Sequence, residues 1–233
     1  MSGAAPPPKR SIFTRSVERI RFGLVTQEVL DWMARVGVLF YPYVVVEEPH
    51  LPRPELDQGL RRFTLRQLFA EDASVIASLP CRPLDEAETR RRLEKRECFG
   101  LFDGGRLLGY TWVKFDCIGS AGHSRDRIGM LPPDSAYLFD AYVARAARGL
   151  KAAPLLRHGV QTLLEARGCR RFFSITLVFN GSSRRFKRKL GAIEFETRII
   201  LGRPAGTALD LRLWRRERRV ELPRFQVMRP MPP

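Results

Sequence analysis

The sequence predicts an α+β fold: one mixed, mostly antiparallel sheet flanked by helices. Three observations support this class. From residue 61 onward, apolar runs of strand length alternate with apolar residues at helical spacing. The turn Asp103-Gly104-Gly105 joins two apolar runs, as is typical of an antiparallel hairpin. A strand–helix–strand order over residues 136–179 requires a right-handed crossover, which places two strands locally parallel.

Length and composition bound the possibilities. The chain has 233 residues, of which 44% are hydrophobic and 28% charged, so it can bury one large core and is neither collagen-like nor wholly disordered. Its longest hydrophobic run, residues 36–46, is too short and too interrupted to span a bilayer. The four cysteines form no C-x-x-C pair and no metal set is visible. We therefore expect reduced thiols and a cytoplasmic protein.

The first 60 residues are predicted to lie outside the main domain. Residues 1–10 are small, polar and proline-rich, which predicts a disordered tail. Residues 11–60 are predicted as an N-terminal extension of helix and strand that ends in a linker. Its strand, residues 36–46, contains Pro42, which favours an edge position or a kink. The prolines of residues 49–59 indicate the linker itself.

The predicted main domain, residues 61–202, begins with a strand at 61–68. Prolines at 80 and 83 separate two short helices at 71–79 and 84–96, because proline does not continue a helix. The hairpin strands follow at 98–102 and 106–115. Residues 118–134 are rich in glycine and proline and predict a long loop of the kind that often carries function.

The second half of this domain continues with a strand at 136–144. A helix at 152–167 places Leu156, Val160, Leu163 and Leu164 on one face and ends at Gly168. An apolar strand at 171–179, a basic helix at 181–190 and a strand at 192–201 complete the domain. Residues 203–233 are predicted as a basic C-terminal extension.

The positive charge is concentrated late in the chain. The net charge is +16, and residues 148–233 carry 20 Lys and Arg against 6 Asp and Glu. Such a field attracts a phosphorylated cofactor, an anionic membrane surface or another polyanion. The alternative is a basic face that is merely solvated. Residues 211–220 mix Trp214 and leucines with arginines, as lipid-binding surfaces do, whereas no nucleic-acid-binding motif accompanies them.

One strand-to-helix junction has the chemistry of an anion site. Between Val143 and Ala153 the residues are mostly small, so backbone N–H groups can approach a phosphate, and Arg148 and Lys151 add formal charge. The start of the following helix adds its partial positive charge. Pro154 is compatible with the first helical turn, where its missing N–H needs no partner.

This junction resembles the acetyl-CoA-binding segment of the GNAT superfamily of N-acetyltransferases, whose pattern is V-x-P-x-x-R-G-x-G-x-G/A. Val143, Arg148, Gly149 and Ala153 match the pattern in register. A later segment, Asn180-x-x-Ser183-x-x-Phe186-x-x-x-Leu190-Gly191-Ala192, resembles the family's second signature, N-x-x-A-x-x-L-Y-x-K-x-G-F. The resemblance covers residues 61–202 and implies a GNAT-like fold with acetyl-CoA as co-substrate.

The resemblance also implies a set of cofactor-binding residues. The backbone of Tyr142 and Val143 would pair with the pantetheine arm. Asn180 and Ser183 would lie where the next strand splays away, and Lys187 would belong to a basic helix that meets another phosphate. The pyrophosphate would be held by the junction itself: Arg148, Gly149, Leu150, Lys151, Ala152 and Ala153. From the residues alone, these cations can equally be solvated, and Asn180 can be a helix N-cap.

Two departures from the family pattern affect the chemistry. Lys151 replaces a glycine of the first signature, and the position of the family's frequent general acid, a tyrosine, is occupied by Lys187. The remaining acid–base candidates are Asp140 in a strand, with Asp116 and His123 in or next to the long loop. Asp140 can instead pair with an arginine, and His123 can simply be solvated.

The sequence therefore predicts an acyl-CoA-dependent N-acyltransferase that moves acetyl to a primary amine of a small or anionic acceptor, such as an amino sugar or a peptide. Two alternatives stay open. One is a GNAT-like protein that binds CoA but has lost catalysis. The other is a basic module that binds anionic lipid or, less favourably, nucleic acid. The oligomeric state is not predicted.

Overall fold

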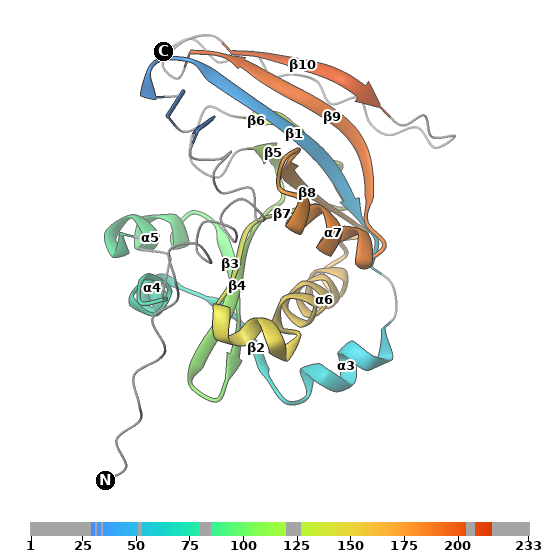
Figure 1. Ribbon diagram of the computed structural model, residues 1–233. Helices are drawn as coiled ribbons and strands as arrows, with labels where there is room; N and C mark the ends of the chain where they lie inside the picture. Colours follow the sequence, from blue (N-terminus) through green and yellow to red (C-terminus); the bar gives the residue numbers. More distant parts are fainter. Residues whose placement is uncertain are drawn as a thin grey trace, which may run out of the picture.

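A computed structural model describes residues 29–30, 32–33, 35–50, 53–79, 85–119, 127–203 and 208–215 (Figure 1). Eight strands form one sheet in the order β10-β9-β1-β8-β7-β4-β3-β2. All neighbouring pairs are antiparallel except β7 and β8, which are parallel. The predicted α+β class and the crossover between two parallel strands are confirmed.

The elements have the following bounds. The strands of the large sheet are β1 (Leu39–Glu48), β2 (Thr64–Leu68), β3 (Glu97–Asp103), β4 (Arg106–Lys114), β7 (Ser135–Val143), β8 (Arg171–Leu177), β9 (Ile193–Gly202) and β10 (Ala208–Arg215). The helices are α3 (Pro54–Leu60), α4 (Ala73–Ala77), α5 (Glu86–Leu93), α6 (Ala152–Glu165) and α7 (Gly181–Lys189), with 3-10 turns η1 (Ala70–Asp72) and η2 (Arg145–Leu150). A second, two-stranded sheet consists of β5 (Cys117–Gly119) and β6 (Arg127–Met130).

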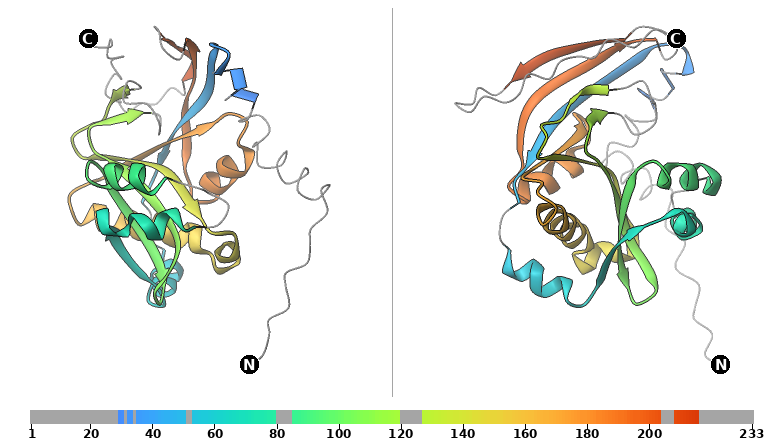
Figure 2. Two further views of the ribbon diagram at one scale, coloured as in Figure 1. Left: turned by 90° about the vertical axis from the view of Figure 1, so that its left-hand side faces the viewer. Right: turned by 180° about the vertical axis from the view of Figure 1, so that it is seen from behind.

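Helices cover both faces of the sheet. Helices α4 and α5 lie on one face of β3 and β4, and α6 lies on the opposite face (Figure 2). The core between these layers contains large side chains that are fully buried, among them Trp112, Tyr110, Phe172, Phe173 and Phe195. Burial of this apolar area provides the main driving force for folding.

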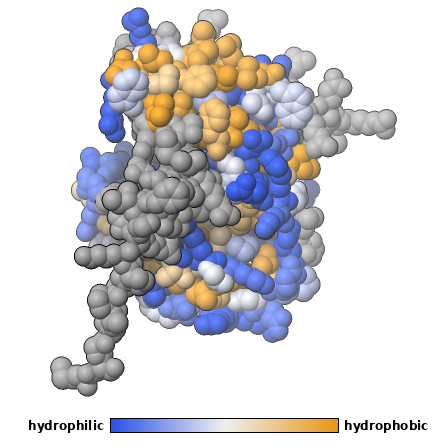
Figure 3. Space-filling model, viewed as in Figure 1, coloured by the Kyte–Doolittle hydropathy of each residue, from blue (hydrophilic) through white to orange (hydrophobic). Residues whose placement is uncertain are grey.

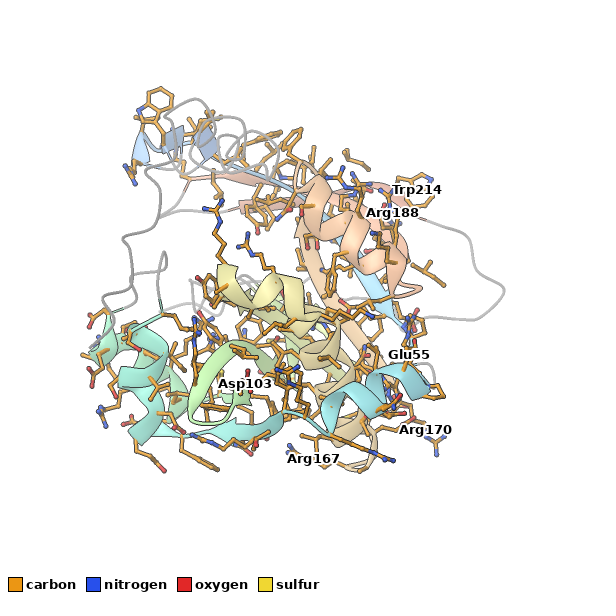
Figure 4. All side chains as sticks on the ribbon, turned by 60° about the horizontal axis from the view of Figure 1, so that its bottom comes forward. Glu55, Asp103, Arg167, Arg170, Arg188 and Trp214 are labelled. Atoms are coloured by element: carbon orange, nitrogen blue, oxygen red, sulfur yellow. The ribbon has the colours of Figure 1, made fainter. Side chains whose placement is uncertain are left out.

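The types of element predicted for residues 61–115 are confirmed. The strand, the two short helices and the hairpin all form close to their expected positions. Asp103 pairs with Arg106 across the two-residue turn Gly104-Gly105, and Asp103 is labelled in Figure 4. Gly104 has a φ of +58°, the left-handed conformation that this primed turn requires. Helices α6 and α7 and strands β7, β8 and β9 also form where they were expected.

Of the two alternatives predicted for Pro42, an edge position or a kink, the edge position is wrong. Strand β1 lies in the interior of the sheet, between β9 and β8. The carbonyl of Pro42 accepts a hydrogen bond from Val178 N–H at 3.1 Å, so the two residues form a hydrogen-bonded pair. Val178 lies just beyond the end of β8, and the missing N–H of Pro42 therefore removes only the last bond of this ladder. Proline is tolerated here because of its position along the strand.

The predicted boundary at residue 60 does not separate two structural units. Strand β1 of the predicted extension forms ladders with β8 and β9 of the predicted domain, and β10 of the predicted C-terminal extension pairs with β9. Within the predicted linker, residues 54–60 form α3, which packs against α6. Leu56 is buried there, and His158 of α6 is buried beside Asp57.

The structure differs from three further predictions or leaves them partly outside the described residues. The predicted loop at 118–134 contains most of the β5–β6 sheet. Leu163 was expected in the core but is 40% exposed, whereas Leu156, Val160 and Leu164 are buried as predicted. The predicted disordered tail and most of the predicted N-terminal helix lie outside the described residues, although Val29, Leu30, Trp32, Met33 and Arg35 are helical.

Strand β10 exposes apolar side chains at the edge of the sheet. Leu209, Leu211, Leu213 and Trp214 are all between 44% and 66% exposed, and Figure 3 shows apolar residues gathered at this end of the molecule. Leu211, Leu213 and Trp214 belong to the predicted Trp- and Arg-containing segment, residues 211–220, of which the structure describes 211–215. Among the helices that the structure describes, none has the length and apolar character needed to cross a membrane.

Gly109 on β4 makes a close approach that a side chain would block. A Cβ at this position would lie 2.6 Å from Tyr142 O and 3.1 Å from Val143 Cα, and backbone atoms cannot move away cheaply. We expect Gly109→Ala to lower the free energy of unfolding by about 2 kcal/mol, measured by urea denaturation. Gly105→Ala in the same hairpin is the control, because no atom lies within 4 Å of its Cβ. Equal losses in the two variants would contradict this interpretation.

Candidate functional site

Strands β7 and β8 part in the middle of the sheet. Their parallel ladder joins Ser135 to Arg171 and ends at the pair Tyr137 and Phe173, although both strands continue. Residues 135–139 of β7 are buried, but Ala141 is exposed and Tyr142 and Val143 are half-buried. A central strand with an exposed stretch has an open side, so the sheet contains an opening between β7 and β8.

Only some residues of β7 direct their backbone N–H and C=O groups into this opening. Ala144 N–H donates to Leu108 O of β4 at 2.8 Å, which makes these residues a hydrogen-bonded pair. Hydrogen-bonded and non-hydrogen-bonded pairs alternate along an antiparallel ladder. The polar backbone groups of Tyr142 therefore point toward β4, and those of Val143 point toward the opening. The backbone groups of Val143 can therefore pair with a ligand in the opening, whereas those of Tyr142 are directed to β4.

A β-bulge lies beside the opening. The register of β4 and β7 shifts between Tyr110 and Trp112, and Asp140 has a φ of +47°. The Asp140 carboxylate accepts a hydrogen bond from Arg92 Nη1 at 2.8 Å, and the Arg92 guanidinium stacks on Trp112 at 4.3 Å. Asp140 thus has the arginine partner that was the alternative to an acid–base role. The ion pair stabilises a left-handed residue that re-aims the backbone where β7 faces the opening.

The junction after β7 exposes the predicted cations. Turn η2 leads to Lys151, which has a φ of +56° and precedes the first residue of α6. Arg148, Gly149, Leu150 and Lys151 are exposed, Ala153 is half-buried, and Ala152 is buried. The first N–H groups of a helix have no intrahelical acceptor. The N–H groups of Ala152 and Ala153 and the side chains of Arg148 and Lys151 therefore form a surface suited to an anion.

Asn180 and Ser183 lie at the start of α7, just after β8. Asn180 Oδ1 accepts a hydrogen bond from Ser183 N–H at 3.0 Å, so Asn180 is the N-cap of α7. Ser183 Oγ lies 3.4 Å from Thr176 Oγ1 of β8. These contacts fix the start of α7 against the strand that borders the opening. The N-cap role of Asn180 is the alternative that the sequence left open beside cofactor binding.

Lys187 is not at the surface of α7. Its side chain is buried, and its Nζ donates to Ile175 O at 3.1 Å and to Thr176 Oγ1. Burial lowers the pKa of Lys187 to about 8, although the nearby Glu48 carboxylate opposes this shift. The resemblance implied that Lys187 belongs to a basic helix that meets another phosphate of the cofactor, but the structure buries its side chain against β8. Arg188, the next residue, is exposed (Figure 4).

The Lys187 ammonium borders the opening. Because Val178 and Pro42 form a hydrogen-bonded pair, the alternation along β8 directs the carbonyl of Thr176 toward β1 and that of Ile175 toward β7. Lys187 Nζ is bonded to Ile175 O and so lies at the edge of β8 that β7 has left. In the resemblance to the second GNAT signature, Lys187 stands where the pattern has a tyrosine.

A buried ionic cluster surrounds Lys187, and the sequence did not reveal it. Glu48 of β1 lies 3.9 Å from Lys187 Nζ and 3.1 Å from Arg157 Nε of α6, and its carboxylate also accepts from Ser174 Oγ. Glu48 and its two cationic partners are each 6% exposed or less at the side chain. These residues come together only because β1 pairs with β8, and no local pattern in the sequence indicates this pairing.

Asp116 and Tyr137 lie in different surroundings from Lys187. Asp116 is exposed between β4 and β5, where its carbonyl accepts from Leu131 N–H at 3.1 Å. His123 lies outside the described residues. Tyr137 is fully buried, and burial raises the pKa of its hydroxyl above the usual range. Among the described residues, no group of three His, Cys, Asp or Glu side chains is arranged to hold a metal ion.

Comparisons with known proteins agree with this geometry. The model of the acetyltransferase (GNAT) family matches residues 62–192. No curated protein matches the chain. A GNAT-family protein from Novosphingobium aromaticivorans aligns over 73% of this chain and 69% of its own length, with 16% identity and a TM-score of 0.50. A glucosamine N-acetyltransferase region in a fungal multi-domain GH3 β-N-acetylglucosaminidase aligns over 77% of this chain and 23% of that one, with 10% identity and a TM-score of 0.54.

A Drosophila protein aligns over 79% of this chain at 14% identity with a TM-score of 0.48, and the chain spans 58% of that protein's length. At 16% and 10% identity, the two structures with TM-scores of 0.50 and 0.54 show a common fold. The family match covers more than half of the chain and includes the junction at 143–153 and the segment at 180–192. The chain therefore belongs to the acetyltransferase (GNAT) family.

Proposed function

We propose that this protein is an acyl-CoA-dependent N-acetyltransferase that transfers acetyl to a primary amine of a small or anionic acceptor, such as an amino sugar or a peptide. The observation that carries the proposal is the opening between β7 and β8, which ends at the exposed junction of Arg148 and Lys151. An extended pantetheine arm fits beside a strand whose backbone groups are directed outward, and a pyrophosphate fits a helix start with two cations.

The residues around the opening suit acetyl-CoA. Val143 would pair through its backbone with the pantetheine amides. Arg148, Lys151 and the N–H groups of residues 148–153 would bind the pyrophosphate. Gly149 has no atom within 4 Å of a Cβ position, so the junction is open to a ligand. When bound, acetyl-CoA would supply an activated thioester to the opening.

Proton transfer needs a donor near the departing sulfur. Lys187 Nζ borders the opening, and a pKa near 8 allows this side chain to hold a proton at neutral pH and to exchange it readily. Lys187 would thus serve where the family frequently uses a tyrosine. The acceptor amine must be unprotonated when it attacks the thioester. After the attack, water can accept the proton that the nitrogen releases.

A transfer assay tests the proposed activity. Thiol release from acetyl-CoA is followed with a panel of amino sugars, peptides and small amines. We expect turnover with at least one amine, and Lys187→Met to lower kcat about 100-fold while the Kd for acetyl-CoA stays unchanged. Arg188→Met on the same helix is the control, because its side chain is 57% exposed.

Two outcomes would favour the alternatives. Tight acetyl-CoA binding with no transfer to any amine would favour a CoA-binding protein that has lost catalysis, for which the missing tyrosine is the supporting observation. Salt-sensitive binding to anionic vesicles without affinity for CoA would favour the basic module. If Lys187→Met and Arg188→Met turn over equally fast, Lys187 is not the proton donor.

A further inference from the structure

Three cations surround one buried aromatic ring on the face of the sheet opposite α6. The guanidinium carbons of Arg92 and Arg96 lie 5.4 and 5.8 Å from the centre of the Phe139 ring, and Lys114 Nζ lies 5.3 Å from it. Arg92 belongs to α5, Arg96 follows this helix, and Lys114 ends β4. We refer to Arg92, Arg96 and Lys114 as the cation cluster.

The positive charge of the cation cluster is only partly compensated. Arg92 pairs with Asp140, but two of its nitrogens, Nε and Nη2, have no hydrogen-bond acceptor in the described part of the chain. Arg96 and Lys114 form no ion pair with any described residue, and both are half-buried. Among the residues that the structure describes, three half-buried cations around one ring with a single paired carboxylate leave an excess of positive charge.

Electrostatics penalise this arrangement unless an anion joins it. Burial lowers the pKa of both Arg96 and Lys114, and the neighbouring cations lower each pKa further, while Asp116 acts in the opposite direction on both and Glu88 on Arg96. Cation–π contact with Phe139 offsets part of the cost. Hydrophobic residues would pack against Phe139 without this repulsion, so the three charges are better explained by a ligand than by packing.

The location of the cation cluster relates it to the opening. Phe139 lies two residues beyond the last pair of the β7–β8 ladder and directly before the bulge at Asp140. Trp112 pairs with Phe139, and Lys114 pairs with Tyr137, so these side chains share the face that α5 covers. The junction of Arg148 and Lys151 leads into α6 on the other face (Figure 2). The cluster is thus separate from the proposed pyrophosphate site and adjacent to the proposed site of transfer.

We propose that Arg96 and Lys114, supported by Arg92, bind an anionic group of the amine acceptor, a carboxylate or a phosphate. That the anion belongs to the acceptor rests on the proposed function, whereas the anion site itself does not. Guanidinium groups bind carboxylate and phosphate oxygens in a fork, and an ammonium adds a point charge. The acceptor is then a molecule with an amine at one end and a negative charge at the other.

Inorganic phosphate and acetate are the probes for the anion site. Trp32 and Trp214 are exposed, so Trp32→Phe/Trp214→Phe leaves Trp112 as the sole tryptophan, directly under the Arg92 guanidinium. We expect saturable fluorescence changes with at least one probe in the millimolar range, compared with chloride at equal ionic strength. Arg96→Gln and Lys114→Met are each expected to weaken binding about tenfold.

The control is Arg91→Gln, which removes an exposed arginine of α5 that pairs with Glu88. It is expected to leave anion binding unchanged. The absence of a saturable response, or equal affinities in Arg96→Gln, Lys114→Met and Arg91→Gln, would overturn the anion site. The relative affinities of phosphate and acetate indicate which anion the site prefers.

A kinetic arm tests the assignment to the acceptor. With an amine that the enzyme acetylates, the tighter-binding probe is expected to inhibit competitively against the amine and not against acetyl-CoA. Competition against acetyl-CoA alone would overturn the assignment. Because the fluorescence titration requires neither acetyl-CoA nor turnover, failure of the proposed transferase activity and failure of the anion site are distinguished.

Discussion

Glu48→Ala is expected to lower the free energy of unfolding by about 3–5 kcal/mol, measured by urea denaturation at pH 7. The side chain of Glu48 is 1% exposed and is the carboxylate that faces both Arg157 Nε and Lys187 Nζ. Removing it leaves two buried cations without their shared anion. Breaking a buried ion pair on one side is strongly destabilising, because the remaining charge has lost both water and its partner.

Glu47→Ala is the matched control. Glu47 is the preceding residue on β1, and it pairs with Arg171, whose side chain is 23% exposed. Because that pair is closer to solvent, we expect a loss of about 1 kcal/mol. Equal losses at Glu47 and Glu48 would show that the buried cluster has no special energetic role.

A double substitution separates the contribution of the charges from that of packing. Glu48→Gln keeps the size of the side chain but removes its charge, and Lys187→Met then removes one of the two orphaned cations. We expect the double variant to be more stable than Glu48→Gln alone, so that the two effects are not additive. Simple addition of the two losses would contradict an electrostatic origin.

The buried ionic cluster of Glu48, Arg157 and Lys187 also explains why β1 belongs to the proposed catalytic unit. Glu48 lies on the strand that the sequence assigned to an N-terminal extension, yet its carboxylate contacts a lysine at the opening. The composition of residues 49–59 suggested a boundary because prolines are common in linkers. In the structure, one of these prolines begins α3 instead, a position that favours proline.

Local patterns sufficed for much of the fold. The hairpin at Gly104, the α6 helix with its apolar face, and the N-cap at Asn180 each depend on residues close in sequence. For the same reason the junction at Arg148 and Lys151 could be predicted as an exposed strand-to-helix turn. Its identity as an acetyl-CoA segment came from resemblance to a family pattern.

The features that could not be predicted depend on contacts between distant residues. Lysine on a basic helix is normally solvated, and only the packing of α7 against β8 buries Lys187. Pro42 is compatible with an interior strand only because β8 ends beside it. The cation cluster likewise combines α5, β4 and β7, which no single segment of sequence brings together.

The double substitution Arg148→Ala/Lys151→Ala is expected to weaken acetyl-CoA binding about a thousandfold. Each side chain would contribute a charge-assisted contact to the pyrophosphate, worth about 2 kcal/mol. Both side chains are exposed, so their loss should leave the free energy of unfolding within about 0.5 kcal/mol of the wild type. The variant therefore tests binding without disturbing the fold.

Arg91→Ala/Lys95→Ala provides the control for this substitution. It removes the same formal charge from exposed residues at α5, on the opposite face of the sheet from α6 (Figure 2). If a general positive field attracted acetyl-CoA, both double variants would lose similar affinity. A loss confined to Arg148→Ala/Lys151→Ala would indicate specific contacts with the phosphates.

The most direct test of this account is a calorimetric titration of acetyl-CoA into the wild type and the two double variants. We expect micromolar binding to the wild type, similar binding to Arg91→Ala/Lys95→Ala, and no measurable binding to Arg148→Ala/Lys151→Ala. The absence of binding to the wild type would contradict the proposed acetyltransferase. Equal binding by all three proteins would contradict the assignment of the pyrophosphate to the junction at the start of α6.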